Sequence, residues 1–220
     1  KSSGKTTVTL GLAAALRAQG TVVQPYKKGP DYIDPMWLAL ASGRPCFNLD
    51  PQLSDLAGLR RDFAQGLPGA ELALVEGNHV LFDGLALDGS TSNAAVAHAL
   101  RLPVLLVIDC RGMTRGIAPL LRGYQAFDRR LRIGGVILNR VGGARHESRL
   151  RTVIAHYTDL PVLGAVAEDP RLALVERHLG LVCSAELEDA AERVAQIGRI
   201  VGARLDLAAI RALAAGAPAL

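Results

Sequence analysis

The sequence predicts an α/β fold in which a parallel β-sheet is flanked by helices. Short, almost continuously apolar runs alternate with longer segments that carry apolar residues at helical spacing. Strands that are buried on both faces have this character, and a repeated strand–helix–strand order favours parallel strands. Half of the 220 residues are hydrophobic, and the chain shows no internal repeat. We therefore expect one domain with a large core.

The expected strands and helices alternate along most of the chain. The strands are expected at residues 21–26, 72–75, 104–108, 135–138 and 162–166. The helices are expected at residues 6–19, 53–65, 94–100, 117–127, 145–157 and 187–201. Residues 205–220 are rich in alanine and end in glycine and proline, which is typical of a helical tail that leads into a linker.

The chain opens with residues typical of a phosphate-binding loop. Gly4, Lys5 and Thr6 directly precede the first expected helix. In such a loop glycine lets backbone N–H groups face the anion, lysine reaches the phosphates, and the threonine hydroxyl ligates Mg²⁺. The alternative is an ordinary helix start with Ser and Thr caps. A long helix followed by a strand favours the phosphate loop, and the strand that should precede the loop is expected ahead of Lys1.

Charged and amide side chains follow the ends of several expected strands. They are Lys27, Lys28, Glu76, Asp109 and Asn139. Because ligands of such sheets bind at the carboxyl ends of the strands, we expect these residues to form one composite site. The segment 29–35, GPDYIDP, belongs to the same site, since its two acids suit metal and phosphate positioning beside two lysines.

Each of these features has a simpler structural alternative. The acids of segment 29–35 suit a proline-bounded turn, and Glu76 could be a solvated turn acid instead of a Mg²⁺ ligand. The hydroxyls and amide of residues 90–93 suit a helix cap. Asn139 could bind an adenine edge through its amide, and Arg140 could pair with a phosphate or a carboxylate, but this dipeptide alone is weak evidence.

Composition and charge narrow the function classes. The net charge of +4 suits a polyanion such as ATP or a polycarboxylate, and it is weak evidence for nucleic acid. Three scattered cysteines indicate reduced thiols, and the five histidines show no metal-ligand spacing. With no visible signal peptide and no apolar run of membrane-spanning length, we expect a cytoplasmic protein without a membrane or nucleic-acid partner.

Several motifs together resemble the cobyrinic acid a,c-diamide synthase family. Residues 25–35, PYKKGPDYIDP, resemble its signature loop, and Glu76-Gly77 resembles a later motif. The remaining matching segments are residues 43–45, 48–50, 81–84, 137–141 and 176–181. The resemblance covers nearly the whole chain in the right order. It implies a P-loop NTPase fold of the dethiobiotin synthetase-like type.

The resemblance implies an ATP- and Mg²⁺-dependent amide synthetase. ATP would phosphorylate a side-chain carboxylate of a tetrapyrrole polycarboxylate, and ammonia would convert the acyl phosphate into an amide. A separate C-terminal glutaminase domain would supply the ammonia. Residues 1–204 would form the synthetase domain without its N-terminal strand, and residues 205–220 the tail and the start of the linker. The sequence does not determine the oligomeric state, and a homodimer is one possibility.

The resemblance also implies roles for individual residues. Catalysis is assigned to Lys5, Lys27, Asp34 and Asp83. Nucleotide binding is assigned to Gly4, Lys5, Thr6, Thr7, Asn139 and Arg140. Mg²⁺ binding is assigned to Thr6, Asp31 and Glu76, and substrate binding to Tyr32, Asp34, Asp83, Ser90 and Thr91.

Three departures from the family pattern lie near the expected substrate side, and one of them is that the segment 90–97 is longer than usual. They bear on the identity of the tetrapyrrole more than on the use of a nucleotide. Lys28 and Val80 stand where a small apolar residue and a glycine are common in the family. An amidase of sirohaem or sirohydrochlorin in the same family is therefore the first alternative. A nucleotide switch of the ParA/MinD type is an alternative of another class. Proteins of that type carry a characteristic lysine early in the phosphate loop, and Lys1 is one residue too close to Gly4 to be that lysine. Segment 29–35 would also have no function in such a switch.

Overall fold

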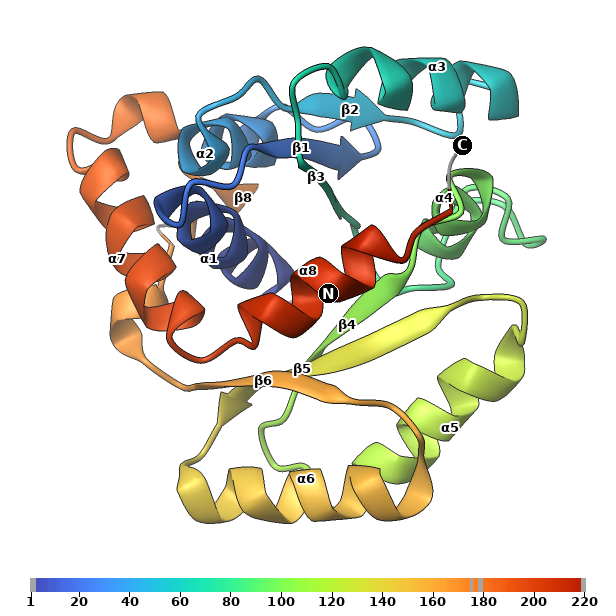
Figure 1. Cartoon of the computed structure of the whole chain (residues 1–220), viewed down its shortest axis with the longest axis vertical. Helices are drawn as coiled ribbons and strands as arrows, with labels where there is room; N and C mark the ends of the chain where they lie inside the picture. Colours follow the sequence, from blue (N-terminus) through green and yellow to red (C-terminus); the bar gives the residue numbers. More distant parts are fainter. Residues whose placement is uncertain (1–2, 175, 178–179, 219–220) are drawn as a thin grey trace.

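The expected alternation of helices and parallel strands is confirmed in the computed structural model, which describes residues 3–174, 176–177 and 180–218 (Figure 1). The strands are β1 (Val23–Lys28), β2 (Phe47–Leu49), β3 (Leu72–Glu76), β4 (Val104–Asp109), β5 (Ile133–Val141), β6 (Val162–Ala167), β7 (Glu176–Arg177) and β8 (Gly180–Leu181). The helices are α1 (Lys5–Ala18), α2 (Ile33–Ser42), α3 (Leu56–Gly66), α4 (Asn93–Ala99), α5 (Ile117–Phe127), α6 (Ala144–Tyr157), α7 (Ala190–Gly202) and α8 (Leu207–Ala215), with short 3₁₀ turns at Pro170–Leu172 and Ser184–Glu186.

The parallel strands form two separate sheets within the described residues. One has the order β2-β1-β3 and the other the order β4-β5-β6, and all of their pairings are parallel. β7 and β8 pair only with each other, in an antiparallel hairpin. We expected a single continuous sheet. Within the described residues, however, β3 pairs only with β1 and β4 pairs only with β5, so the sheet is interrupted between β3 and β4.

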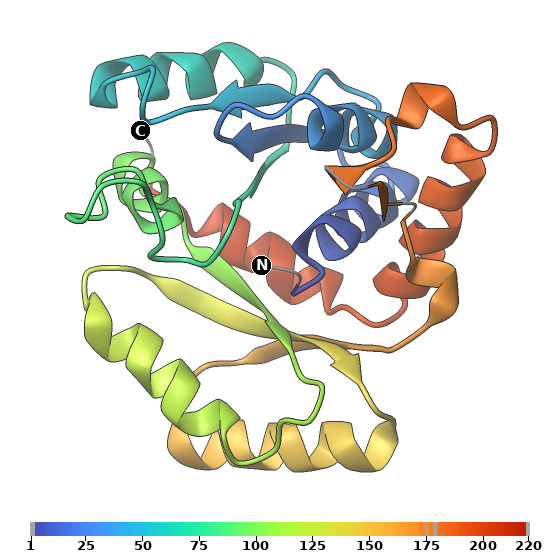
Figure 2. The ribbon, with the colours of Figure 1, turned by 180° about the vertical axis from the view of Figure 1, so that it is seen from behind.

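The helices cover both faces of the two sheets (Figures 1 and 2). α5 and α6 pack on one face of the β4-β5-β6 sheet, where Leu121, Leu138 and Leu150 are fully buried. α3 and α4 pack on one face of the other sheet, around Tyr26 and Phe63. α1 and α8 lie between the two halves of the molecule, and α7 packs against α1 at the side of the molecule. No helix in the described part of the chain is long and apolar enough to cross a membrane.

The segment 29–35 is not the simple turn that proline and aspartate suggested. Its second half is the first turn of α2, which begins at Ile33. Asp31 Oδ1 accepts the backbone N–H groups of Ile33 and Asp34, so it does the work of an N-cap. Pro35 lies in the first turn, where a missing N–H costs nothing. Trp37 is fully buried on this helix, and its Nε1 donates to Val182 O at 2.8 Å.

Candidate functional site

The start of α1 is held in a tight turn against β5. Gly4 has φ of +80°, a conformation that favours glycine, and a Cβ there would collide with the Asn139 side chain. Asn139 Nδ2 donates to Ser3 O at 2.8 Å, so this amide positions the backbone just before Lys5. The start of the helix is therefore held in place. The backbone N–H groups of its first turn, at Lys5, Thr6 and Thr7, have no partner within the helix, and a phosphate site requires such groups in an ordered position. Contact of Asn139 with adenine stays a prediction.

A buried ammonium group lies between carboxylates at the ends of β1 and β3. Lys27 is 3% exposed, and its Nζ lies 2.5 Å from Asp34 Oδ2 and 3.1 Å from Glu76 Oε1. Lys27 and Glu76 are direct neighbours in the parallel register of the two strands. Thr6 Oγ1 donates to the same Glu76 oxygen at 2.6 Å. The tertiary structure thus brings α1, α2, β1 and β3 together, as the composite site required.

The second carboxylate oxygen of Glu76 is buried and has no hydrogen-bond partner among the residues that the structure describes. Burial raises the pKa of Glu76, and the Lys27 ammonium and the hydrogen bond from Thr6 offset this only in part. Burial lowers the pKa of Lys27, but the charges of Glu76 and Asp34 outweigh it and raise the pKa overall. The ammonium therefore stays charged, and the orphaned oxygen is available for a cation.

Only part of the expected metal set is assembled. The described residues contain no group of three or more His, Cys, Asp or Glu side chains that could hold a metal ion. Thr6 and Glu76 are in contact, but Asp31 caps α2 and lies 4.0 Å from Lys27 Nζ. Mg²⁺ usually takes one or two protein oxygens and completes its shell with phosphates and water. The pair Thr6 and Glu76 fits that pattern without Asp31.

Of the five expected substrate residues, Asp34 belongs to the Lys27 cluster, and the other four have no printed hydrogen bond or ion pair with it among the described residues. Tyr32 is 77% exposed, and Asp83 is exposed in the loop 77–92. Thr91 Oγ1 accepts the N–H groups of Leu85 and Ala86, which stabilises that loop. Ser90 is exposed, and its backbone N–H donates to Asp88. The cap of α4 is their neighbour Ser92, as the capping alternative implied for this segment. Substrate contacts of these four residues stay predictions.

Three further charged side chains, Asp109, Arg111 and Arg140, were not recognised as partners from the sequence. Asp109, at the end of β4, pairs with Arg111 and with Arg140, whose Nη1 lies 2.8 Å away. Its partial burial raises the pKa, but hydrogen bonds from both arginines outweigh this and lower the pKa of Asp109 to about 2. The sequence showed that Asp109 and Arg140 follow the ends of expected strands, but this position did not show that their side chains pair with one another.

Lys28 points away from Lys27, as neighbouring strand residues do. It is 5% exposed, and its Nζ donates to Asn78 Oδ1 at 3.1 Å. Asn93 in turn accepts the Asn78 N–H and donates to Val80 O. Burial lowers the pKa of Lys28, and Asp50 raises it only in part. These contacts tie β1 to the base of the loop 77–92.

Comparison with known proteins is consistent with this geometry. The family described as the CobQ/CobB/MinD/ParA nucleotide binding domain matches residues 2–182. A cobyrinate a,c-diamide synthase of Magnetococcus marinus is 48% identical over the whole chain and 47% of its own length. Hydrogenobyrinate a,c-diamide synthases of Brucella ovis and Mycobacterium tuberculosis are each 45% identical over 96% of the chain and 48% of their length. The chain therefore spans about half the length of these curated relatives.

Proposed function

Because this chain belongs to the CobQ/CobB/MinD/ParA nucleotide-binding domain family, we propose that it is the ATP-dependent half of a tetrapyrrole a,c-diamide synthase. The observation that carries the proposal is the contact of Lys27 with Asp34 and Glu76 beside the start of α1. It places a buried cation and an orphaned carboxylate oxygen next to a turn suited to phosphate. The relative from Magnetococcus marinus, which is named as a diamide synthase, matches over the whole chain and therefore covers this cluster.

The proposed reaction has two transfers. A substrate carboxylate oxygen attacks the γ-phosphorus of ATP, the bond from that phosphorus to the bridging oxygen breaks, and ADP leaves. Ammonia then attacks the carbonyl carbon of the acyl phosphate, orthophosphate leaves with the electrons of the C–O bond, and the nitrogen loses a proton. The carboxylate is a poor electrophile by itself, and phosphorylation supplies the leaving group.

The residues of the cluster have separate tasks in this proposal. The Lys5 ammonium neutralises charge on the transferring phosphoryl group, because it extends from the first turn of α1. Lys27 orients the γ-phosphate or the substrate carboxylate, and Asp34 holds the Lys27 ammonium in place. Thr6 and Glu76 would hold Mg²⁺, which when bound supplies charge neutralisation at the phosphates. Asp83, Tyr32, Ser90 and Thr91 would contact the substrate from the exposed loops.

Ammonia would come from glutamine through a glutaminase domain. This is supported by the length of the relatives, which extend well beyond the part that matches this chain. The 220-residue chain should accordingly use an ammonium salt but not glutamine as the nitrogen source. Cobyrinic and hydrogenobyrinic acid are the first substrates to test, and sirohydrochlorin and sirohaem are the alternatives within the family.

A substrate panel read by mass spectrometry tests the proposal. The chain is mixed with Mg-ATP, an ammonium salt and each tetrapyrrole acid in turn, and Lys5→Ala serves as the inactive variant. We expect conversion of acid to amide on one compound, with ADP formed in step. Amide formation on none of them, with ATP binding intact, contradicts the proposal. ATP hydrolysis stimulated by DNA or lipid vesicles instead would favour a nucleotide switch of the MinD/ParA type.

A further inference from the structure

β5 is irregular close to its carboxyl end. Its pairing with β6 skips one residue between Asn139 and Val141, so Arg140 is the extra residue of a β-bulge. Arg140 also has φ of +55°, which is uncommon for a residue with a side chain. Its Nη2 lies 3.9 Å from the position that a Cβ of Gly4 would take. Bulges and such backbone conformations occur often beside functional sites, and they persist only where neighbouring contacts hold them.

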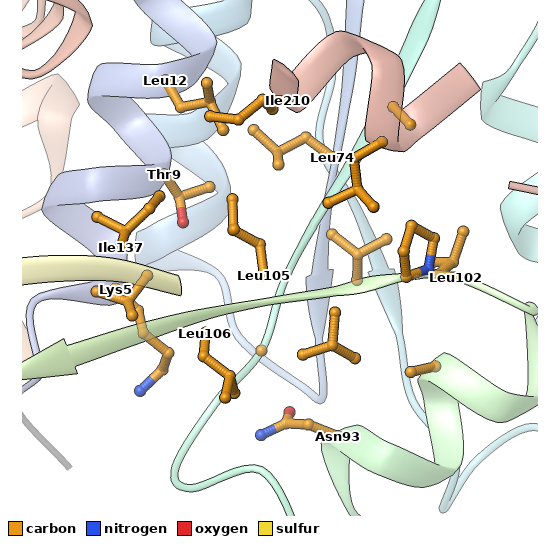
Figure 3. A pocket seen from close by; sticks show the side chains of 18 of the residues that line it. Lys5, Thr9, Leu12, Leu74, Asn93, Leu102, Leu105, Leu106, Ile137 and Ile210 are labelled. Atoms are coloured by element: carbon orange, nitrogen blue, oxygen red, sulfur yellow. The ribbon is translucent and has the colours of Figure 1, made fainter. Parts of the chain in front are cut away.

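The residue ahead of the bulge holds the turn into α1. Asn139 Nδ2 donates to Ser3 O at 2.8 Å, directly before the first helical residues. Figure 3 shows Ile137, two residues earlier on β5, on the lining of the same cavity as Lys5. The carboxyl end of β5 therefore lies against the residues that are expected to bind phosphate, and a shift of this strand end would shift the turn as well.

A histidine bridges the chain after the bulge to the loop that follows β4. His146, in the first turn of α6, accepts the backbone N–H of Gly142 at its Nδ1, over 3.0 Å. Its Nε2 lies 2.6 Å from Met113 O. A backbone N–H can only donate and a carbonyl oxygen can only accept, so the imidazole in this bridge is neutral and carries its proton on Nε2. Both ring nitrogens are thus used by the bridge.

The bridge closes a ring of hydrogen bonds around the bulge. At one end of the ring Cys110 N donates to Asn139 O at 2.9 Å, and Met113 N donates to Cys110 O at 3.0 Å. At the other end His146 ties Met113 to Gly142. The segments that follow β4 and β5 are therefore joined on both sides of the bulge. The His146 end is made by a side chain, so a single substitution can open the ring.

We propose that His146 is a positioning residue for the nucleotide. Through the ring it keeps Asn139 aimed at Ser3, and it thereby keeps the phosphate turn ordered without touching a ligand itself. This inference rests on the nucleotide-binding part of the proposed function and not on the identity of the amidated substrate. A turn that takes its binding conformation in only about a tenth of the molecules binds its ligand about tenfold more weakly. A loss of that size is expected when the ring is opened.

Affinity for Mg-ATP, measured by titration calorimetry, tests the role of His146. His146→Ala removes both ends of the bridge, whereas His146→Asn keeps an acceptor near the position of Nδ1 and His146→Gln keeps a donor near the position of Nε2. We expect about a tenfold loss of affinity in His146→Ala and a partial recovery in each of the other two. His98→Ala is the matched control, because His98 Nε2 lies 2.8 Å from Asp128 and also joins two segments. It should leave the affinity unchanged.

A double-mutant cycle tests the route from His146 to the phosphate turn. If His146 acts through Asn139, His146→Ala should weaken ATP binding much less in an Asn139→Ala background than in the unaltered chain. Binding of inorganic triphosphate, which has no base, should fall by the same factor as binding of ATP. If His146→Ala fails to fold, His146→Asn and His146→Gln carry both comparisons, since each keeps one of the two hydrogen bonds.

Four results would each overturn the inference. They are an unchanged affinity in the His146 variants, an equal loss in His98→Ala, additive effects in the cycle with Asn139, and a loss for ATP that inorganic triphosphate does not share. Full recovery in His146→Asn or His146→Gln alone would show that a bridge is not needed, and it would overturn the inference too. None of these readouts requires amide synthesis, so failure here is distinct from failure of the proposed function.

Discussion

Replacing the buried lysine of the site should produce a large and pH-dependent loss of stability. In Lys27→Met the ammonium that lies 2.5 Å from Asp34 and 3.1 Å from Glu76 is lost, while the side chain keeps a similar length. Glu76 is 2% exposed and, among the described residues, would retain only the hydrogen bond from Thr6. The variant therefore leaves a buried carboxylate without its cation.

The size of the effect follows from this burial. Removing one partner of a buried ion pair costs about 3–5 kcal/mol. That is a large part of the roughly 5–15 kcal/mol by which a domain is stable. For a chain of this length each kcal/mol lowers the unfolding midpoint by about 2–4 °C, so the midpoint should fall by about 6–20 °C.

The pH dependence has a definite sign. Burial already raises the pKa of Glu76, and loss of the ammonium raises it further. An acid whose pKa is raised in the folded state favours folding at low pH and loses that contribution as the pH rises through the folded pKa. The deficit of Lys27→Met relative to the unaltered chain should therefore be larger at about pH 8 than at about pH 5.

Thermal unfolding followed by circular dichroism at both pH values measures this. The double variant Lys27→Met/Glu76→Gln is the control, since it also removes the charge that was left unpaired. We expect the double variant to be more stable than Lys27→Met alone, which is a favourable coupling in the double-mutant cycle. An unchanged midpoint for Lys27→Met, or a double variant no more stable than the single one, would refute the reasoning.

Three other expectations concern the same end of the sheets. Glu76→Gln should weaken ATP binding about tenfold or more in Mg²⁺ but not in EDTA, as isothermal titration calorimetry can measure; equal weakening in both would remove Glu76 from the metal set. Gly4→Ala should abolish ATP binding, because its Cβ would collide with Asn139. Gly20→Ala is the control for backbone strain, since Gly20 has φ of +85° and open space around it. Equal losses of ATP binding in the two variants would contradict the collision. Asp109 pairs with Arg111 and Arg140, and the resulting low pKa of about 2 stabilises the unaltered chain above about pH 4. This stabilisation is lost as the pH falls towards the folded pKa, and Asp109→Asn should remove it at all pH values. Identical acid unfolding of the two chains would contradict the pairing.

Most of the fold could be predicted from periodicity, because strands and helices bury apolar residues at different spacings. α2, β2 and the β7–β8 hairpin were missed. β2, β7 and β8 have only two or three residues each, too few to show a period. α2 begins inside a segment rich in proline and aspartate, which suit both a turn and a first helical turn. The family motif at residues 176–181 lies partly outside the described residues, so only its strand pairing is known.

Local sequence alone determined that this chain has a turn suited to phosphate, two lysines after a strand and acids at other strand ends, since each depends on neighbouring residues. Only the tertiary structure decided which of these groups meet. It pairs Lys27 with Asp34 and Glu76, turns Lys28 towards Asn78, and commits Asp31 to capping α2. The physical reason is that register, strand alternation and helix docking set distances between residues far apart in the chain.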